Sequence, residues 1–140
     1  MPNESQKKIL IIEVVEDDAP LLSVLSERFK GEGYSVVTAM TGEEGLALAL
    51  KNKPDLILLD IVMPKMDGIT MFKKLRQDPW GKKANVILLT NLSADDKITK
   101  AVTELEPSYY LIKTDWKLDD IVEKVKSLKC WILGRRIRLP

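Results

Sequence analysis

Apolar positions along the chain form short continuous runs, separated by stretches in which they recur at helical spacing. A run of bulky aliphatic residues bounded by polar ones is typical of a strand buried on both faces of a parallel sheet. The runs that predict strands are Ile9–Val15, Tyr34–Thr38, Leu56–Asp60, Val86–Thr90 and Tyr109–Lys113. Because strands that alternate with single helices favour right-handed crossovers, we expect one three-layer α/β domain with a doubly wound, five-stranded parallel sheet and five helices.

Capping residues indicate where the helices between these strands begin and end. Asp18, followed by Pro20, is suited to start the first helix, and Gly31 is suited to end it. The segment Thr41–Glu44 matches a capping box and predicts a second helix that runs to about Asn52. The remaining helices are predicted at about 69–77, 95–106 and 118–128.

Composition excludes several functional classes without selecting one. The 140 residues carry a net charge of +1, so the overall charge does not point to nucleic acid or to a membrane surface. No apolar stretch approaches the roughly 20 residues that a membrane-spanning helix needs. The single cysteine, Cys130, cannot form an internal disulfide, which fits a reducing, cytoplasmic location. Because the chain contains no histidine, it cannot itself supply a phosphohistidine, a histidine base or a histidine metal ligand.

Polar side chains stand at the carboxyl ends of the predicted strands. They are Glu16, Asp17 and Asp18 after the first strand, Asp60 on the third, Thr90 on the fourth and Lys113 on the fifth. Since these ends meet at one edge of a parallel sheet, we expect the side chains to converge. Gathered carboxylates repel one another unless a divalent cation bridges them, and an all-oxygen ligand set favours Mg²⁺ or Mn²⁺. A carboxylate nucleophile, a hard cation, a hydroxyl and an ammonium group together predict phosphoryl transfer, with Asp60 becoming an aspartyl phosphate.

The chain resembles the receiver domain of two-component response regulators over about residues 7–128. Four segments carry the resemblance: Val15-Glu16-Asp17-Asp18, Leu58–Gly68 around Asp60, Leu88-Leu89-Thr90, and Tyr110-Leu111-Ile112-Lys113. Each segment is common alone, whereas all four in this order and at these separations are a specific signal. The resemblance implies a flavodoxin-like sheet with the strand order 2-1-3-4-5.

The resemblance also implies a role for each matching residue. Asp60 would accept a phosphoryl group from a sensor histidine kinase or a phosphotransfer protein. Glu16 and Asp17 would hold Mg²⁺ together with Asp60 and the backbone carbonyl of Val62. The domain would catalyse only its own phosphorylation and dephosphorylation, so we do not expect an enzyme.

Further roles implied by the resemblance concern signalling. Thr90 and Lys113 would contact the phosphoryl group, and Thr90 and Tyr110 would form the conformational switch. The face built from the fourth helix, the fifth strand and the fifth helix would bind a downstream protein. We expect a monomer or weak dimer with no direct contact to nucleic acid and no membrane span.

Three other functions are compatible with parts of this pattern. A receiver-like interaction module that is never phosphorylated is favoured if Glu13, inside the first predicted strand, distorts the acidic pocket. A phosphohydrolase with an aspartate nucleophile commonly needs a second aspartate two residues on, where this chain has Val62. Flavin binding is disfavoured, because the acidic residues after the first strand would repel a cofactor phosphate.

Glu13 also departs from the family pattern, which usually has an aliphatic residue there. A carboxylate in a central strand is costly unless it is paired or neutralised. We therefore expect a bulge, a slipped register, or a strand extended at its start by Ile9–Ile11.

Other departures lie near the phosphoryl site and before the fifth strand. Thr114 follows Lys113 where the family usually has a cis proline, so a trans peptide is expected. Pro107 replaces a glycine-containing turn and offers an alternative helix stop. Val62 and Leu92 cannot polarise a water molecule, which predicts slow self-dephosphorylation.

The last twelve residues, 129–140, follow the predicted receiver domain at 1–128. Their Trp131, aliphatic residues and three arginines could dock on a partner, an anionic membrane surface or a second subunit. The favoured interpretation is an extension that packs loosely against the last helix. Because 129–140 is too short for an output domain, we expect a stand-alone receiver that signals by protein–protein contact.

Overall fold

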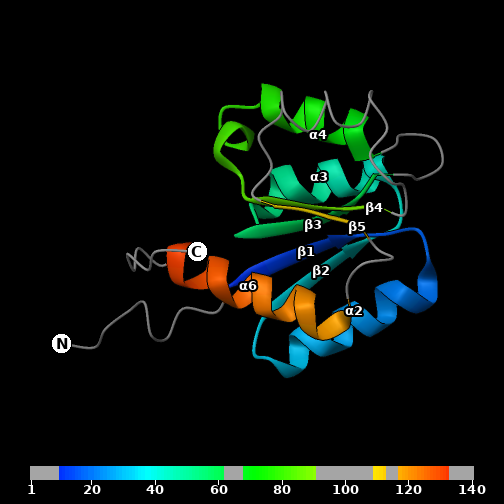
Figure 1. Cartoon of the computed structure of the whole chain (residues 1–140). Helices are drawn as coiled ribbons and strands as arrows, with labels where there is room; N and C mark the ends of the chain where they lie inside the picture. The colour runs from blue at the N-terminus through cyan, green and yellow to red at the C-terminus, as the bar shows by residue number, and fades with distance from the viewer. Residues whose placement is uncertain (1–9, 62–67, 91–108, 113–116, 133–140) are drawn as a thin grey trace.

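The computed structural model describes residues 10–61, 68–90, 109–112 and 117–132. These residues fold into a parallel sheet with helices on both faces (Figure 1). The strands are β1 (Ile11–Val15), β2 (Ser35–Ala39), β3 (Leu56–Asp60), β4 (Val86–Thr90) and β5 (Tyr109–Ile112). The helices are α2 (Ala19–Gly31), α3 (Gly42–Asn52), α4 (Gly68–Gln77), the 3₁₀ helix η1 (Gly81–Lys83) and α6 (Leu118–Ile132).

The strands lie in the order β2-β1-β3-β4-β5, and every neighbouring pair is parallel. The predicted doubly wound α/β architecture with a parallel sheet is therefore confirmed. The helix predicted at 95–106 lies outside the described residues, so the predicted number of five helices stays a prediction. None of the helices in the described ranges is both long enough and apolar enough to cross a bilayer.

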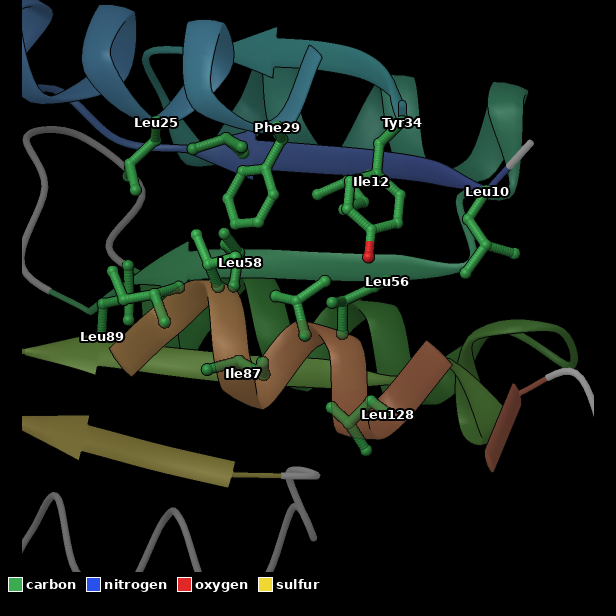
Figure 2. Close-up of a cluster of buried hydrophobic side chains, with 14 of the residues drawn as sticks. Leu10, Ile12, Leu25, Phe29, Tyr34, Leu56, Leu58, Ile87, Leu89 and Leu128 are labelled. Carbon is green, nitrogen blue, oxygen red and sulfur yellow. The ribbon is translucent and has the colours of Figure 1, made fainter. Parts of the chain in front are cut away.

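Two apolar clusters hold the helices to the sheet. Figure 1 shows α2 and α6 on one face and α3 and α4 on the other. On the first face, Phe29 of α2 packs with Ile12 and Leu58 from the central strands, as Figure 2 shows. On the second face, Met71 and Phe72 of α4 pack with the opposite sides of β1, β3 and β4. Alternate residues of the buried strands thus serve opposite layers, which is why these strands are apolar throughout.

Both predicted helix caps are present. The Asp18 side chain accepts a hydrogen bond from the backbone N–H of Leu21 at 3.2 Å, and proline occupies the first turn of α2. The Thr41 hydroxyl accepts one from the backbone N–H of Glu44 at 3.1 Å. In return, the Glu44 carboxylate accepts from the N–H of Met40, one residue before the cap. The bonds to Leu21 and Glu44 satisfy N–H groups that a helix start leaves without intrahelical partners, and the bond from Met40 fixes the residue before the cap.

The expectation of a bulge or slipped register in β1 is wrong. Residues Ile11–Val15 pair in unbroken sequence with β2, and Ile12–Val15 do so with β3. The strand begins at Ile11, and Leu10, the first described residue, lies outside it; Ile9 lies outside the described residues. A slip would have turned Ile12 and Val14 out of the core, and the regular register instead buries Glu13.

Several element boundaries differ from those predicted, among them both ends of β2 and the end of α6. The second strand spans Ser35–Ala39 rather than Tyr34–Thr38. Just before it, Tyr34 donates its backbone N–H to the Phe29 carbonyl at 3.0 Å and packs edge-on against the Phe29 ring, with ring centroids 5.8 Å apart. Helix α6 continues through Ile132, past residue 128, where the predicted receiver domain ends. The start of the 129–140 extension is therefore helical, in continuation of α6.

Candidate phosphoacceptor and metal site

Three carboxylates meet at the carboxyl edge of the sheet. Val15 of β1 pairs with Leu59 of β3, so Glu16 and Asp17 leave β1 beside Asp60 at the end of β3. One carboxylate oxygen from each of these three acidic residues lies within 4.8 Å of the other two. Glu16 is 0% and Asp60 3% exposed, whereas Asp17 is exposed. The sequence predicted this convergence of two strand ends.

Local backbone contacts hold Glu16 at this edge. Its backbone N–H donates to the carbonyl of Ala39 at 3.0 Å, which continues the pairing with β2 beyond the strand. Its side chain accepts a hydrogen bond from the backbone N–H of Asp18 at 3.2 Å. The turn from β1 into α2 thus orients the glutamate toward the other two carboxylates.

The cluster has the chemistry of a divalent cation site. Three carboxylates this close repel one another, and a hard cation between them removes the repulsion. Their oxygen atoms form the ligand set that Mg²⁺ and Mn²⁺ prefer, and the exposed side at Asp17 leaves room for the water or phosphate ligands that Mg²⁺ keeps. The residues present therefore fit the predicted ion.

The remaining predicted site residues are placed only in part. Thr90 ends β4 with its backbone paired to Ile112, and Tyr110 of β5 pairs with Leu88. The side chains of Thr90 and Tyr110 lie outside the described part of the chain. Residues Val62, Asn91, Leu92, Lys113, Thr114 and Pro107 lie outside it altogether. Their predicted roles stay predictions.

Gly68, to which the sequence analysis gave no role, positions the end of β3. Its backbone N–H donates to the Ile61 carbonyl at 2.7 Å, which brings the first residue of α4 against the end of β3. A β-carbon at this position would overlap the carbonyl oxygen of Asp60. The glycine after Asp67 in the sequence was the available signal, although its contact with β3 could not be inferred from spacing.

We predict that Gly68→Ala lowers the free energy of unfolding by roughly 1–3 kcal/mol, because backbone must move to admit the methyl group. Gly31→Ala is the matched control: Gly31 ends α2, and a β-carbon there meets nothing within 4 Å. Since alanine favours helical backbone, the control should be neutral or slightly stabilising. Urea denaturation of the two variants measures both effects, and equal stabilities would contradict the assigned contact.

Comparison with known proteins identifies the family. Residues 12–126 match the family model described as the response regulator receiver domain. This chain belongs to that family. Receiver domains act in two-component signalling, phosphorylation and Mg²⁺ binding are general features of the family, and such domains are signalling units rather than conventional enzymes.

Curated relatives of this receiver domain include longer regulators. The alkaline phosphatase synthesis transcriptional regulatory protein PhoP of Bacillus subtilis is 38% identical over 110 residues, which is 71% of this chain and 45% of that protein. The DNA-binding dual master transcriptional regulator RpaA of Synechocystis is 36% identical over 128 residues, 91% of this chain and 50% of that protein. This chain thus spans about half the length of these two relatives or less.

Solved receiver structures agree with the fold. A CheY-like response regulator receiver domain protein from Methanospirillum hungatei has a TM-score of 0.81 at 25% identity, covering 89% of this chain and 97% of that one. The BeF3-activated N-terminal receiver domain of RstA from Klebsiella pneumoniae has a TM-score of 0.74 at 26% identity, covering 85% and 97%.

Proposed function

We propose that this receiver domain is a phosphorylation switch with Asp60 as its phosphoacceptor. The observation that carries the proposal is the convergence of Glu16, Asp17 and Asp60, with carboxylate oxygens within 4.8 Å of one another. Asp60 combines a nearly buried position with a place at the sheet edge where open α/β folds bind ligands.

The reaction is a phosphoryl transfer between two proteins. Because the chain has no histidine, the phosphohistidine belongs to a sensor histidine kinase or a phosphotransfer protein. A carboxylate oxygen of Asp60 attacks phosphorus, the phosphorus–nitrogen bond breaks, and the leaving imidazole takes up a proton. The product is an acyl phosphate on Asp60, and the domain turns over only this modification of itself.

Each site residue then has a task in binding or signalling. Glu16 and Asp17 hold the metal with Asp60 and the backbone carbonyl of Val62. Thr90 and Lys113 bind phosphoryl oxygens. Thr90 and Tyr110 form the conformational switch that responds to phosphorylation. A bound Mg²⁺ or Mn²⁺ supplies positive charge that offsets the charge on the phosphoryl oxygens.

The output of the domain is a protein contact on the face formed by the predicted 95–106 helix, β5 and α6. Phosphorylation shifts the population of this face toward its binding form. The alternative, a receiver-like module that is never phosphorylated, is favoured if Glu13 distorts the acidic pocket. The unbroken pairing of β1 with β2 and β3 speaks against such a distortion.

The proposal is tested by incubating the protein with acetyl phosphate and Mg²⁺ and measuring its intact mass. We expect a gain of one phosphoryl group per chain, and no gain when a chelator replaces Mg²⁺. Absence of any gain at saturating acetyl phosphate and Mg²⁺ would contradict the switch and favour the interaction module.

We predict that the phosphorylated form is long-lived compared with receivers that carry polar residues at positions 62 and 92. Val62 and Leu92 offer no group that could polarise an attacking water. The double variant Val62→Asn and Leu92→Glu should shorten the half-life of the acyl phosphate, followed by intact mass after removal of acetyl phosphate. An unchanged half-life would rule out this explanation.

A further inference from the structure

Glu13 is a buried acidic residue with no task in the phosphoryl-transfer chemistry. Its side chain is 0% exposed, and both carboxylate oxygens lack a hydrogen-bond partner within the described structure. An ionised carboxylate without partners in an apolar interior carries a large free-energy penalty, which protonation removes. The position therefore selects the neutral acid.

The strand geometry places this carboxyl group in the layer between the sheet and the helices α3 and α4. Glu13 stands between Val37 of β2 and Ile57 of β3. Alternation along β1 turns it to the same face as Val15, which belongs to the apolar cluster of that layer. The buried side chains that α4 contributes to this cluster are Met71, Phe72 and Leu75.

The charge that faces Glu13 from the neighbouring helix is negative. Burial is the main cause that raises the pKa of Glu13 from 4.5 to about 8, and repulsion from Glu44 in the first turn of α3 adds to it. Val37 and Ile57, which pair with Glu13 from β2 and β3, are apolar, and so are the buried side chains of α4. The causes of the pKa shift include no cation.

Helix α3 packs closely against the end of β1, next to the acidic site. A β-carbon at Gly45 would lie 2.8 Å from Cγ2 of Val15, so the absence of a side chain lets α3 approach the end of β1 closely. Glu16 is the next residue along the chain, three positions after Glu13. The residue of β1 that contacts α3 is therefore directly followed by the first residue of the acidic site.

We propose that Glu13 is a proton-dependent packing switch. As a neutral acid it allows β1 and α3 to pack closely, and its ionisation at alkaline pH loosens this contact and the adjoining carboxylate site. The switch goes beyond phosphorylation, because it makes the geometry of the site depend on pH whether or not Asp60 is modified.

The sign of the pH dependence follows from proton uptake on folding. Between pH 4.5 and about 8 the unfolded chain has lost the Glu13 proton while the folded chain keeps it. The contribution of Glu13 to stability is therefore full below pH 4.5, falls as the pH rises through this window, and levels off above about 8.

The test compares wild type with Glu13→Met and Glu13→Gln by urea denaturation from pH 5 to pH 9. Between pH 5 and pH 9, we expect the ratio of the wild-type unfolding constant to that of Glu13→Met to rise by on the order of a hundredfold or more. Each unit of pKa shift changes this ratio tenfold. Glu13→Gln should run parallel to Glu13→Met, because neither side chain titrates. Glu27→Gln removes an exposed carboxylate from α2 and should track wild type.

Hydrogen exchange separates a local switch from a general loss of stability. The protection of each amide in wild type is compared with that in Glu13→Gln at the same pH. At pH 9 the amides of β1 and α3 should be less protected in wild type, and the amides of α6 should change less. A ¹³C titration of the Glu13 carboxyl in wild type needs no variant, and a midpoint near 4.5 would overturn the proposal. So would a wild-type-to-methionine stability difference that does not change with pH, or an equal loss of protection in all three elements.

Discussion

Asp60→Asn is expected to abolish phosphoryl acceptance from acetyl phosphate and Mg²⁺ and to leave the protein folded. An amide oxygen is not a nucleophile comparable with a carboxylate, so the acyl phosphate cannot form. The side chain is nearly the same size, and removing one of three close carboxylates lowers their mutual repulsion. Stability in the absence of metal should therefore be unchanged or slightly higher. Intact mass measures the first effect, and urea denaturation without added metal measures the second.

Asp18→Asn is the matched control for this experiment. Asp18 lies beside the site and is exposed, but it caps α2 and is not one of the three clustered carboxylates. Asparagine preserves an N-cap, so this variant should fold and be phosphorylated like wild type. A phosphoryl gain in Asp60→Asn equal to that of the control would contradict the assignment of the phosphoacceptor.

The second large effect is expected for metal affinity in Asp17→Asn. Asp17 is the exposed member of the cluster, so its replacement removes a metal ligand without disturbing buried packing. Loss of an outer-shell partner alone typically lowers metal affinity by roughly 10- to 100-fold, and loss of a direct ligand should exceed that. Titration calorimetry with Mg²⁺ measures the change. The Asp18→Asn variant should stay close to wild type, because its lost charge is outside the cluster.

Equal Mg²⁺ affinity in wild type and Asp17→Asn would show that the ion, if bound, lies elsewhere. The same preparations can be phosphorylated at saturating Mg²⁺, where partial recovery of Asp17→Asn is expected because higher metal concentration offsets weaker binding. Asp60→Asn should not recover under any metal concentration. This difference distinguishes a residue that holds the metal from the residue that is modified.

Local signals predicted the parts of this fold that depend on neighbouring residues. The apolar run Leu56–Leu59 identified β3, and the caps Asp18 and Thr41 identified two helix starts, because each effect acts within a few residues. The convergence of Glu16, Asp17 and Asp60 was also predictable, since parallel strands bring their carboxyl ends to one edge.

Contacts between distant segments and the state of a buried proton were not predictable from the pattern. Glu13 was expected to disturb β1, because a charged side chain is costly in a core. The register is regular instead, and burial raises the pKa of Glu13 to about 8, which favours the neutral acid. The role of Gly68 depends on how closely α4 meets β3, a distance that spacing does not encode. The predicted end of the last helix, at residue 128, followed the usual length of the family. The sequence between Leu118 and Gly134 contains no glycine or proline, and α6 runs on to Ile132.

The most direct test of the central claim is to locate the modification in wild-type protein. The protein is treated with acetyl phosphate and Mg²⁺, the acyl phosphate is trapped chemically, and peptides are sequenced by tandem mass spectrometry. We predict a single modified residue, Asp60, and none when Mg²⁺ is withheld. Modification at another residue, or modification of Asp60 at the same rate without a divalent cation, would contradict a metal-assisted phosphoacceptor at the junction of β1 and β3.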